Sequence, residues 1–404
     1  MPDKSTANPA AIVVGGGPAG LTTAISLAVG GIRTTLVRLR PATSDNRTTA
    51  LLAGSVVALE ALEVWPLCMD QAAPLRIMRI VDDTGRLWRA PEVAFSAREI
   101  DREAFGYNIE NRHLVAALEK RAGELPALTV IEDEVLRVEP QADAIVATLQ
   151  RNDALRGRLV IGADGRKSIC RAAAGIALDE RKYPQVALTL CLSHSRPHQD
   201  TSTEFHTPSG PFTLVPLPGN RSSLVWVLDP GAVDELAARG DDELAALVEK
   251  SSHSILGKVR IEPGRGLFPL NVATARRFAD KRIALVGEAA HALPPIGAQG
   301  LNLGLRDAAT IAELVVDAQR NRHDIGGSDL LMRYDRMRRA DVGSRTLAID
   351  LLNRTLLSDL LPLQGVRGLG LYLLDRVGPL RRAVMREGIA PALSQPRLMR
   401  GRPF

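Results

Sequence analysis

A glycine-rich turn near the start of the chain restricts the possible folds more than any other feature. Residues 11 to 14 form an apolar run, and Gly15, Gly17 and Gly20 follow at the spacing GxGxxG. A helix pattern and a second apolar run, over residues 32 to 39, come next. This order predicts a βαβ unit. Glycines at the head of its helix would let phosphates approach the backbone, where the helix dipole favours negative charge. We therefore expect a Rossmann-like dinucleotide site.

The acid that usually completes such a site is missing. An Asp or Glu about 20 residues after the glycines normally binds the ribose hydroxyls. Here the second strand ends in LVRLRP, with Arg38 and Arg40. Two interpretations stay open. One is an NADP site, in which an arginine accommodates the 2′-phosphate. The other is an FAD site without the acid, in which Arg38 packs along the adenine or meets solvent.

Two more glycine-and-acid motifs follow downstream. In LVIGADGRKSICR, Asp164 stands between glycines after a predicted strand, and in RIALVGEAAHALPPIGAQGLNLGL, Glu288 follows another buried run. After Pro294 and Pro295, the second motif predicts a helix start whose free amides stabilise anionic charge. The alternative interpretations are an ordinary turn residue at Asp164 and a dipole-complementing acid at Glu288. We expect His291 to be a partly buried histidine with its hydrogen bonds satisfied.

The chain organisation predicts two interleaved domains. A length of 404 residues exceeds what one core usually supports. From about 183 to 275, β-branched runs alternate with Pro and Gly turns, including a hairpin at LPGNRS, which predicts an antiparallel sheet. The expected fold class is α/β of a two-domain α+β kind. The expected boundaries are a Rossmann-like domain at 1–74, 106–182 and 276–345, an inserted substrate-binding sheet domain at 75–105 and 183–275, and a C-terminal helical region at 346–404.

Cysteine usage and hydropathy predict a cytoplasmic protein without a metal site. Cys68, Cys170 and Cys191 are widely spaced and form no CxxC pair, so neither a zinc site nor a disulfide framework is expected. No secretory signal and no run of 18 uncharged apolar residues is present.

Charge is concentrated near the end of the chain. The 51 basic residues exceed the acidic ones by five, and residues 351 to 404 carry nine arginines against three acids. Aromatic residues make up only 3% and no nucleic-acid module is present, so nucleic acid is not an expected partner. The basic, Leu-rich end predicts either a solvated helical face or contact with an anionic membrane surface.

The order GxGxxG, GADG, GEAAHxxPPxGAQGxNxG resembles the flavoprotein aromatic hydroxylases related to para-hydroxybenzoate hydroxylase. The likeness covers residues 11 to about 340 and is greatest to the hydroxylases of ubiquinone biosynthesis, whose signatures the segments 45–65, 104–118 and 210–226 also resemble. The resemblance implies one FAD-binding domain, a sheet domain over the flavin ring and no separate nicotinamide domain. The cofactor-binding residues that it implies are Gly15, Gly17, Ala19, Gly20, Arg38, Arg47, Asn111, Asp164, Glu288, Pro295, Gly297, Gly300, Leu301 and Asn302.

The resemblance also implies a role for most of these residues. The glycines of the first motif and Arg47 would face the pyrophosphate, Asp164 and Glu288 the ribityl and phosphate region, and residues 300–302 the ring. Glu288 is one methylene longer than the family's usual Asp. Asn111 occupies the position where many relatives carry an arginine.

The implied activity is that of a flavin-dependent monooxygenase, in which NAD(P)H reduces FAD and O₂ supplies a hydroxyl group to an electron-rich ring. The nearest subgroup implies a lipophilic substrate, a polyprenylated phenol of ubiquinone biosynthesis, and a place at the inner face of a membrane or in a biosynthetic complex. Two alternatives stay open: hydroxylation of a small soluble phenol, or a non-catalytic member of such a complex. The sequence identifies no catalytic base.

Overall fold

The computed structural model describes residues 8–39, 47–85, 91–294, 298–357, 378–389 and 395–404. A six-stranded sheet lies at its centre, in the order β19-β20-β12-β1-β2-β8. Its strands run parallel, apart from the antiparallel edge strand β19. The strands are β1 (Ala11–Val14), β2 (Thr34–Arg38), β8 (Leu128–Glu132), β12 (Leu159–Gly162), β19 (Ala279–Asp280) and β20 (Ile283–Leu285).

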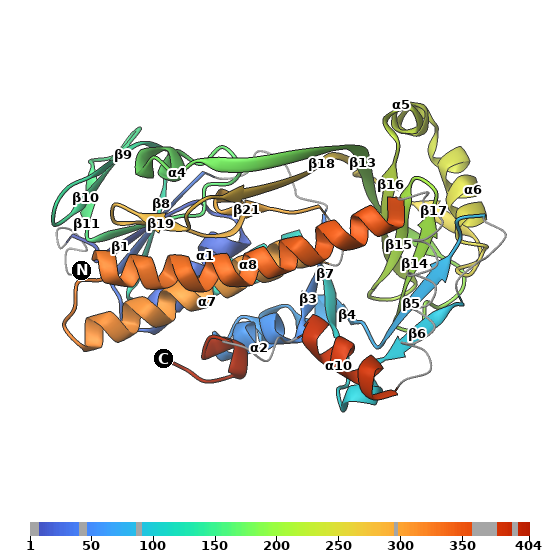
Figure 1. The fold of residues 1–404 in the computed structure, drawn as a ribbon, viewed down its shortest axis with the longest axis horizontal. Helices are drawn as coiled ribbons and strands as arrows, with labels where there is room; N and C mark the ends of the chain where they lie inside the picture. Colours follow the sequence, from blue (N-terminus) through green and yellow to red (C-terminus); the bar gives the residue numbers. More distant parts are fainter. Residues whose placement is uncertain (1–7, 40–46, 86–90, 295–297, 358–377, 390–394) are drawn as a thin grey trace.

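The predicted βαβ unit is confirmed. β1 pairs in parallel with β2, and α1 (Pro18–Val29) connects them. β1 is apolar throughout because it is buried at the centre of a parallel sheet. α1 packs against α7 (Gln299–Arg320), which runs beneath the long helix α8 (Ser328–Leu357) in Figure 1. The predicted helix at 111–122 is α3 (Asn111–Glu124).

A second, nine-stranded sheet has the order β21-β18-β13-β16-β15-β14-β5-β6, with β17 paired to β13. The predicted hairpin is formed by β15 and β16, and strands from 75–105 join the same sheet. One expectation was wrong, because β5 and β14 pair in parallel rather than antiparallel. The strands are β5 (Ile77–Asp82), β6 (Val93–Ser96), β13 (Leu178–His194), β14 (Thr201–Thr207), β15 (Gly210–Leu217), β16 (Arg221–Leu228), β17 (Val259–Ile261), β18 (Gly266–Ala275) and β21 (His291–Ala292).

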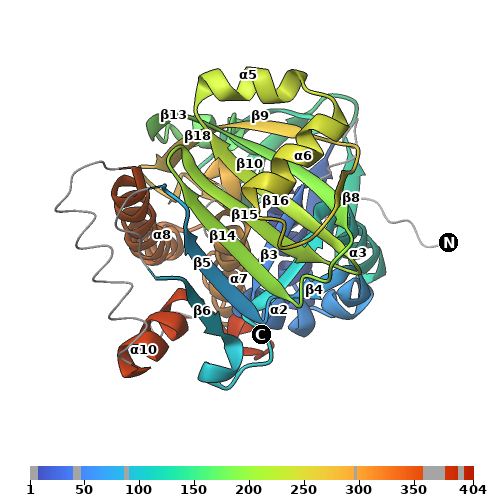
Figure 2. The same cartoon turned by 90° about the vertical axis from the view of Figure 1, so that its right-hand side faces the viewer.

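Two helices that we did not expect, α5 (Pro230–Ala238) and α6 (Asp241–Ser251), interrupt the sheet region. They lie on the outer side of the large sheet, facing the viewer in Figure 2. Side chains that alternate along the strands fill the core beneath them, among them Phe205, Phe212 and Leu224. Because successive strand residues point to opposite faces, the intervening side chains face the six-stranded sheet.

Smaller elements complete the fold. β3 (Thr48–Leu52), β4 (Ala72–Pro74) and β7 (Gly106–Glu110) form one three-stranded sheet, and β9 (Val135–Pro140), β10 (Ile145–Leu149) and β11 (Leu155–Gly157) form another. The remaining helices are α2 (Ala53–Ala61), α4 (Ile169–Ala174), α10 (Gly378–Ile389) and the 3-10 turns η1 (Trp65–Leu67), η2 (Met69–Gln71), η3 (Ala97–Ile100), η4 (Gly287–Ala289) and η5 (Leu398–Arg400). The described part of the C-terminal region is thus helical, as expected. No helix in the described ranges is long and apolar enough to cross a membrane.

Candidate active site

A cavity of about 1380 Å³ extends from the carboxyl ends of β1 and β2 to the inner face of the large sheet. Ligand pockets commonly measure roughly 300–1,000 Å³, so this cavity has room for more than one ligand. Pro295 and Gly297 lie outside the described residues. The predicted site residues that line the cavity are Gly15, Gly17, Ala19, Gly20, Arg38, Arg47, Asn111, Asp164, Glu288, Gly300 and Leu301.

The glycines of the first turn are needed for two different reasons. A Cβ atom on Gly15 would lie 2.2 Å from the Ala163 carbonyl oxygen, and one on Gly20 would lie 2.0 Å from the Gly15 carbonyl oxygen. These two glycines let the turn pack closely. A Cβ atom on Gly17 would meet nothing within 4 Å, and Gly17 caps α1 without a side-chain hydrogen bond. The first turn of α1 therefore offers its amides to the cavity.

A second helix N-terminus borders the same cavity. A Cβ atom on Gly304 of α7 would lie 3.2 Å from the Gly287 Cα and 3.3 Å from the Ala19 Cβ, so these small residues allow α7 to approach α1. α7 begins at Gln299, within the segment after the prolines where the sequence predicted a helix start, and no described side chain caps it. A Cβ atom on Gly300 would meet no protein atom within 4 Å. The cavity thus has two positive helix ends, which suit an anionic ligand.

Arg38 is largely buried. Its guanidinium pairs with Glu119 of α3 and lies 3.7 Å from Glu132 of β8, and only 11% of its side chain is exposed. Its stem covers Gly16. Two carboxylates therefore balance its charge, which counts against the interpretation of a 2′-phosphate site.

Glu119 is the functional residue that sequence reasoning missed here. It lines the cavity and pairs with Arg38, so α3 places an acid beside the end of β2. It lies 81 residues from Arg38 on the polar side of a predicted helix, and no sequence signal connected the two.

Asp164 and Glu288 lie at the carboxyl ends of adjacent strands. The Asp164 carboxylate accepts hydrogen bonds from the Ser168 hydroxyl (2.6 Å) and the Cys170 amide (3.1 Å), so it stabilises the start of α4. A carboxylate has about four acceptor positions, which leaves capacity for a ligand. Glu288 is half exposed and lies 3.2 Å from Arg166.

Arg47 and the two predicted asparagines differ in what they offer to the cavity. The Arg47 guanidinium lies over the Phe268 ring, 5.7 Å from its centre. Asn111 accepts a hydrogen bond from the Thr49 hydroxyl at 2.6 Å. Asn302 is buried, and its amide bonds Leu52, Ser55, Ala50 and Ala298. Asn302 does not line the cavity, whereas its neighbours Gly300 and Leu301 do, so its amide holds the start of α7 in place.

A buried network lies behind the Glu288 turn. Asp307 accepts hydrogen bonds from the Gly287 amide (2.9 Å) and from Arg338 of α8 (2.6 Å), and its carboxylate lies 2.6 Å from the His291 Nε2. Burial alone would raise the pKa of Asp307, but His291 and Arg338 hold it below its ordinary value. The expectation for His291 was partly wrong: it is almost fully buried, and its Nδ1 has no partner among the described residues.

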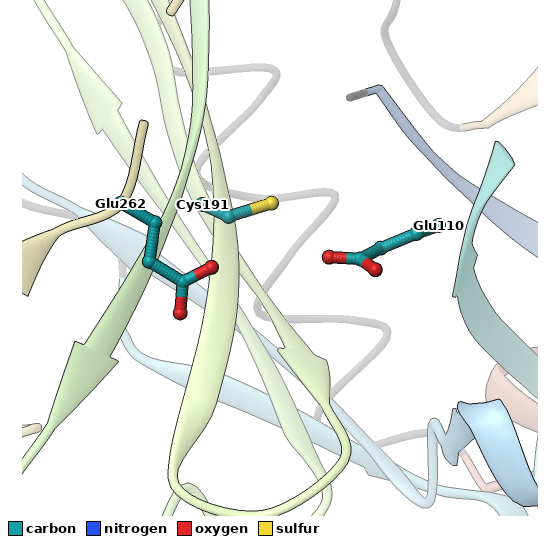
Figure 3. Close-up of side chains that lie close together, drawn as sticks. All are labelled: Glu110, Cys191 and Glu262. Carbon is teal, nitrogen blue, oxygen red and sulfur yellow. The ribbon is translucent and has the colours of Figure 1, made fainter. Parts of the chain in front are cut away.

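A second network joins β7 to the large sheet. Figure 3 shows Glu110 facing Cys191 and Glu262. One carboxylate oxygen of each glutamate and the Cys191 sulfur lie within 4.8 Å of one another. Arg221 bonds both carboxylates, at 2.8 and 2.6 Å. Burial would raise the pKa of Glu110, but hydrogen bonds from Arg221 and Arg112 lower it. Burial raises the pKa of the Cys191 thiol to about 11, so the thiol is neutral. This cluster acts as an ionic cross-link.

Comparisons with known proteins identify the family. Residues 9–347 match the model of the FAD binding domain family. The chain is 36% identical to the ubiquinone hydroxylase UbiL of Rhodospirillum rubrum over 97% of this chain and 93% of the relative. It is 30% identical to the 3-demethoxyubiquinol 3-hydroxylase of Escherichia coli over 93% and 97%.

Solved structures share the fold. The p-nitrophenol 4-monooxygenase PnpA of Pseudomonas putida matches with a TM-score of 0.74 at 18% identity, over 94% of this chain and 97% of that one. HpxO of Klebsiella pneumoniae, complexed with FAD and uric acid, matches with a TM-score of 0.74 at 19% identity, over 94% and 96%.

The residues present fit FAD. The open position at Gly17 and the N-termini of α1 and α7 suit a pyrophosphate and an anionic ring edge, and the cavity volume of about 1380 Å³ leaves room for both. Arg38, whose charge Glu119 balances, lies beside the first glycine turn. Geometry, family match and near-full-length relatives agree: the chain belongs to the FAD binding domain family and is an FAD-dependent monooxygenase.

Proposed function

We propose that this protein hydroxylates the aromatic ring of a polyprenylated phenol, a precursor of ubiquinone, with NAD(P)H and O₂ as co-substrates. The observation that carries the proposal is the near-full-length similarity to two ubiquinone-pathway hydroxylases. Bound FAD, once reduced, supplies the oxygen-activating chemistry. The family match and these relatives favour this catalytic function over a non-catalytic role in a complex.

The chain's own residues would bind, orient and shield. The amides of α1 would hold the pyrophosphate, with Arg47 as a nearby positive charge, and the amides of α7 would meet the anionic side of the ring. Asp164 and Glu288 would accept hydroxyl hydrogen bonds from the linker between ring and phosphate. The large sheet covers the other end of the cavity and limits the access of water to the reacting ring.

A lipophilic substrate is favoured over a small soluble phenol by the wall of the cavity. Leu75, Met78, Val215 and Val225 line its sheet end. These side chains provide apolar contact for an isoprenoid chain beside the ring.

Product analysis tests the function directly. The purified, FAD-loaded protein is given NADH or NADPH with prenylated or simple phenols, and products are identified by mass spectrometry. We expect gain of one oxygen atom with prenylated phenols at a higher kcat/KM than with simple ones. A strain lacking the gene should accumulate a prenylated precursor that lacks one ring hydroxyl. Equal or better turnover of simple phenols, without precursor accumulation, would contradict the proposal.

We also propose that α10 contacts an anionic membrane surface, from which such a substrate would be delivered. Arg381 anchors α10 to Glu99, and Met385 packs in a cluster with Met78, which lines the cavity. Arg382 and Arg386 are exposed on this helix. α10 therefore carries exposed basic side chains beside the cavity wall.

Vesicle binding tests this contact. The double variant Arg382→Glu/Arg386→Glu should lose binding to phosphatidylglycerol vesicles and keep its turnover of a soluble short-chain phenol. The matched control Arg137→Glu/Arg151→Glu changes two exposed arginines in the region of β9 and β10, away from α10 in Figure 1, and should bind as the wild type does. Equal binding by both variants would refute the role of α10.

A further inference from the structure

We call the end of the cavity that the large sheet lines the chamber. Among the described residues of the large sheet that line the chamber, one has a carboxylate. That residue is Glu204 of β14. Strand alternation places it there, because Phe205, the next residue, points into the core under α5 and α6. The other residues that line the chamber from the same face of this sheet's central strands are neutral; they are Thr189, Cys191, Ser202, Pro211, Thr213, Val215, Ser223 and Val225.

The Glu204 carboxylate is held in place and still has capacity to accept. The His206 Nε2 lies 2.8 Å from Oε1, and the Thr213 hydroxyl donates to Oε2 over a long 3.3 Å. Thr213 is the direct cross-strand partner of Glu204 in the pairing of β14 with β15. Two of about four acceptor positions are therefore used. The side chain is 25% exposed, so the carboxylate is reachable but partly desolvated.

A carboxylate in this setting recognises a hydrogen-bond donor. Charge-assisted hydrogen bonds are about twice as strong as neutral ones, and partial removal from water strengthens them further. A ligand that combines an apolar body with one hydroxyl donor matches the chamber, because its wall includes the apolar side chains of Met78, Val215 and Val225 beside the carboxylate. A phenol with a hydrocarbon substituent has this chemistry.

We propose that Glu204 accepts the hydrogen bond of the substrate's ring hydroxyl and thereby selects phenols and fixes which ring carbon is presented. This assignment rests on the proposed function, because it names the residue that recognises the phenol in that reaction. Accepting this hydrogen bond draws electron density from the O–H bond toward the ring oxygen, which makes the ring more electron-rich. His206 acts as a positioning residue that holds the carboxylate toward the chamber.

The test compares a phenol with its methyl ether, which keeps the shape but lacks the donor. FAD-loaded protein is titrated with 2-geranylphenol and with its O-methyl ether, and binding is followed by the change in flavin absorbance. We expect the wild type to bind the phenol at least tenfold more tightly than the ether. In Glu204→Gln this preference should fall at least fivefold, and in Glu204→Met it should disappear.

The matched control is Glu235→Gln, an exposed carboxylate on α5 at the outer side of the sheet, which should keep the wild-type preference. Bound FAD and the urea midpoint of each variant show that it is folded. Equal binding of phenol and ether by the wild type, or a preference that persists in both Glu204 variants, would overturn the assignment.

The same titration separates this inference from the proposed function. A preference that depends on Glu204 supports the assignment even where mass spectrometry finds no hydroxylated product from any prenylated phenol, and that absence of product would count against the proposed function alone. A protein that hydroxylates prenylated phenols but shows no Glu204-dependent preference keeps the proposed function and loses the assignment.

Discussion

Adding the same methyl group at Gly17 and at Gly20 should separate cofactor binding from folding. At Gly20 the new Cβ would lie 2.0 Å from a carbonyl oxygen, so α1 must move by about 1.4 Å to reach ordinary contact at 3.4 Å. Such overpacking costs about 1–3 kcal/mol. With a urea m-value of roughly 3 kcal/mol per molar, Gly20→Ala should lower the urea midpoint by about 0.3–1 M.

At Gly17 the methyl group would meet no protein atom, and the backbone φ of −71° suits alanine. A stiffer unfolded chain adds about 0.4–1 kcal/mol of stability, and a poorer N-cap costs a similar amount. Gly17→Ala should therefore leave the stability of the FAD-free protein nearly unchanged. The methyl group would instead occupy space needed by the pyrophosphate. Losing one charge-assisted hydrogen bond costs about 1.5–3 kcal/mol, which weakens FAD binding roughly 10- to 150-fold.

Two measurements decide the outcome. Urea unfolding of the FAD-free variants, followed by circular dichroism, gives the midpoints, and quenching of flavin fluorescence gives the Kd for FAD. The reasoning is refuted by an unchanged Kd in Gly17→Ala, or by a drop of its urea midpoint as large as that of Gly20→Ala.

Three further predictions concern the ionic networks. Asp307→Asn should lower the free energy of unfolding by about 1–3 kcal/mol, because it removes one of the two carboxylates, Asp307 and Asp341, that pair with the buried Arg338; an unchanged urea midpoint would contradict this. Glu119→Gln should weaken FAD binding, because Arg38 loses the nearer of its two carboxylates. Fluorescence titration should show a higher Kd for FAD in this variant than in the control Glu124→Gln, and equal Kd values would contradict the prediction. Because the pKa of Glu110 is lowered in the folded state, its stabilising effect is present above the ordinary value of 4.5 and is lost as pH falls below it. The difference in urea midpoint between wild type and Glu110→Gln should shrink between pH 6 and pH 3, and a constant difference would exclude the effect.

The sequence predicted the features that depend on local backbone. The GxGxxG turn, the helix start at Gln299 and the β15–β16 hairpin each rest on short-range rules for glycine, proline and strand alternation, and all three were found. The helices α5 and α6 were missed although a helix signal was present. Asp229 and Pro230 begin the first, and three acids occupy the first turn of the second.

Contacts between distant segments could not be read from the sequence. Arg38 seemed to threaten the FAD interpretation because its partner Glu119 belongs to a helix whose position only the fold determines. Asn302 stands in a motif beside a predicted ring site, yet its amide joins α7 to β3 and α2. Both cases depend on which surfaces pack together, and the local pattern carries no information on that.

Side chains of the large sheet point alternately to the core and to the chamber, so mutations that affect stability and mutations that affect ligand choice fall at different positions. Residues such as Phe212 and Leu224 hold the sheet to α5 and α6, while their neighbours Thr213 and Val225 face the chamber. Mutations on the chamber side can alter which molecule is accepted without removing a core contact. The three glycine-containing turns of the cofactor site follow β1, β12 and β20 of the six-stranded sheet, so mutations in the large sheet leave them in place. A library confined to the chamber-facing positions should consequently yield many folded, flavin-binding enzymes with new preferences.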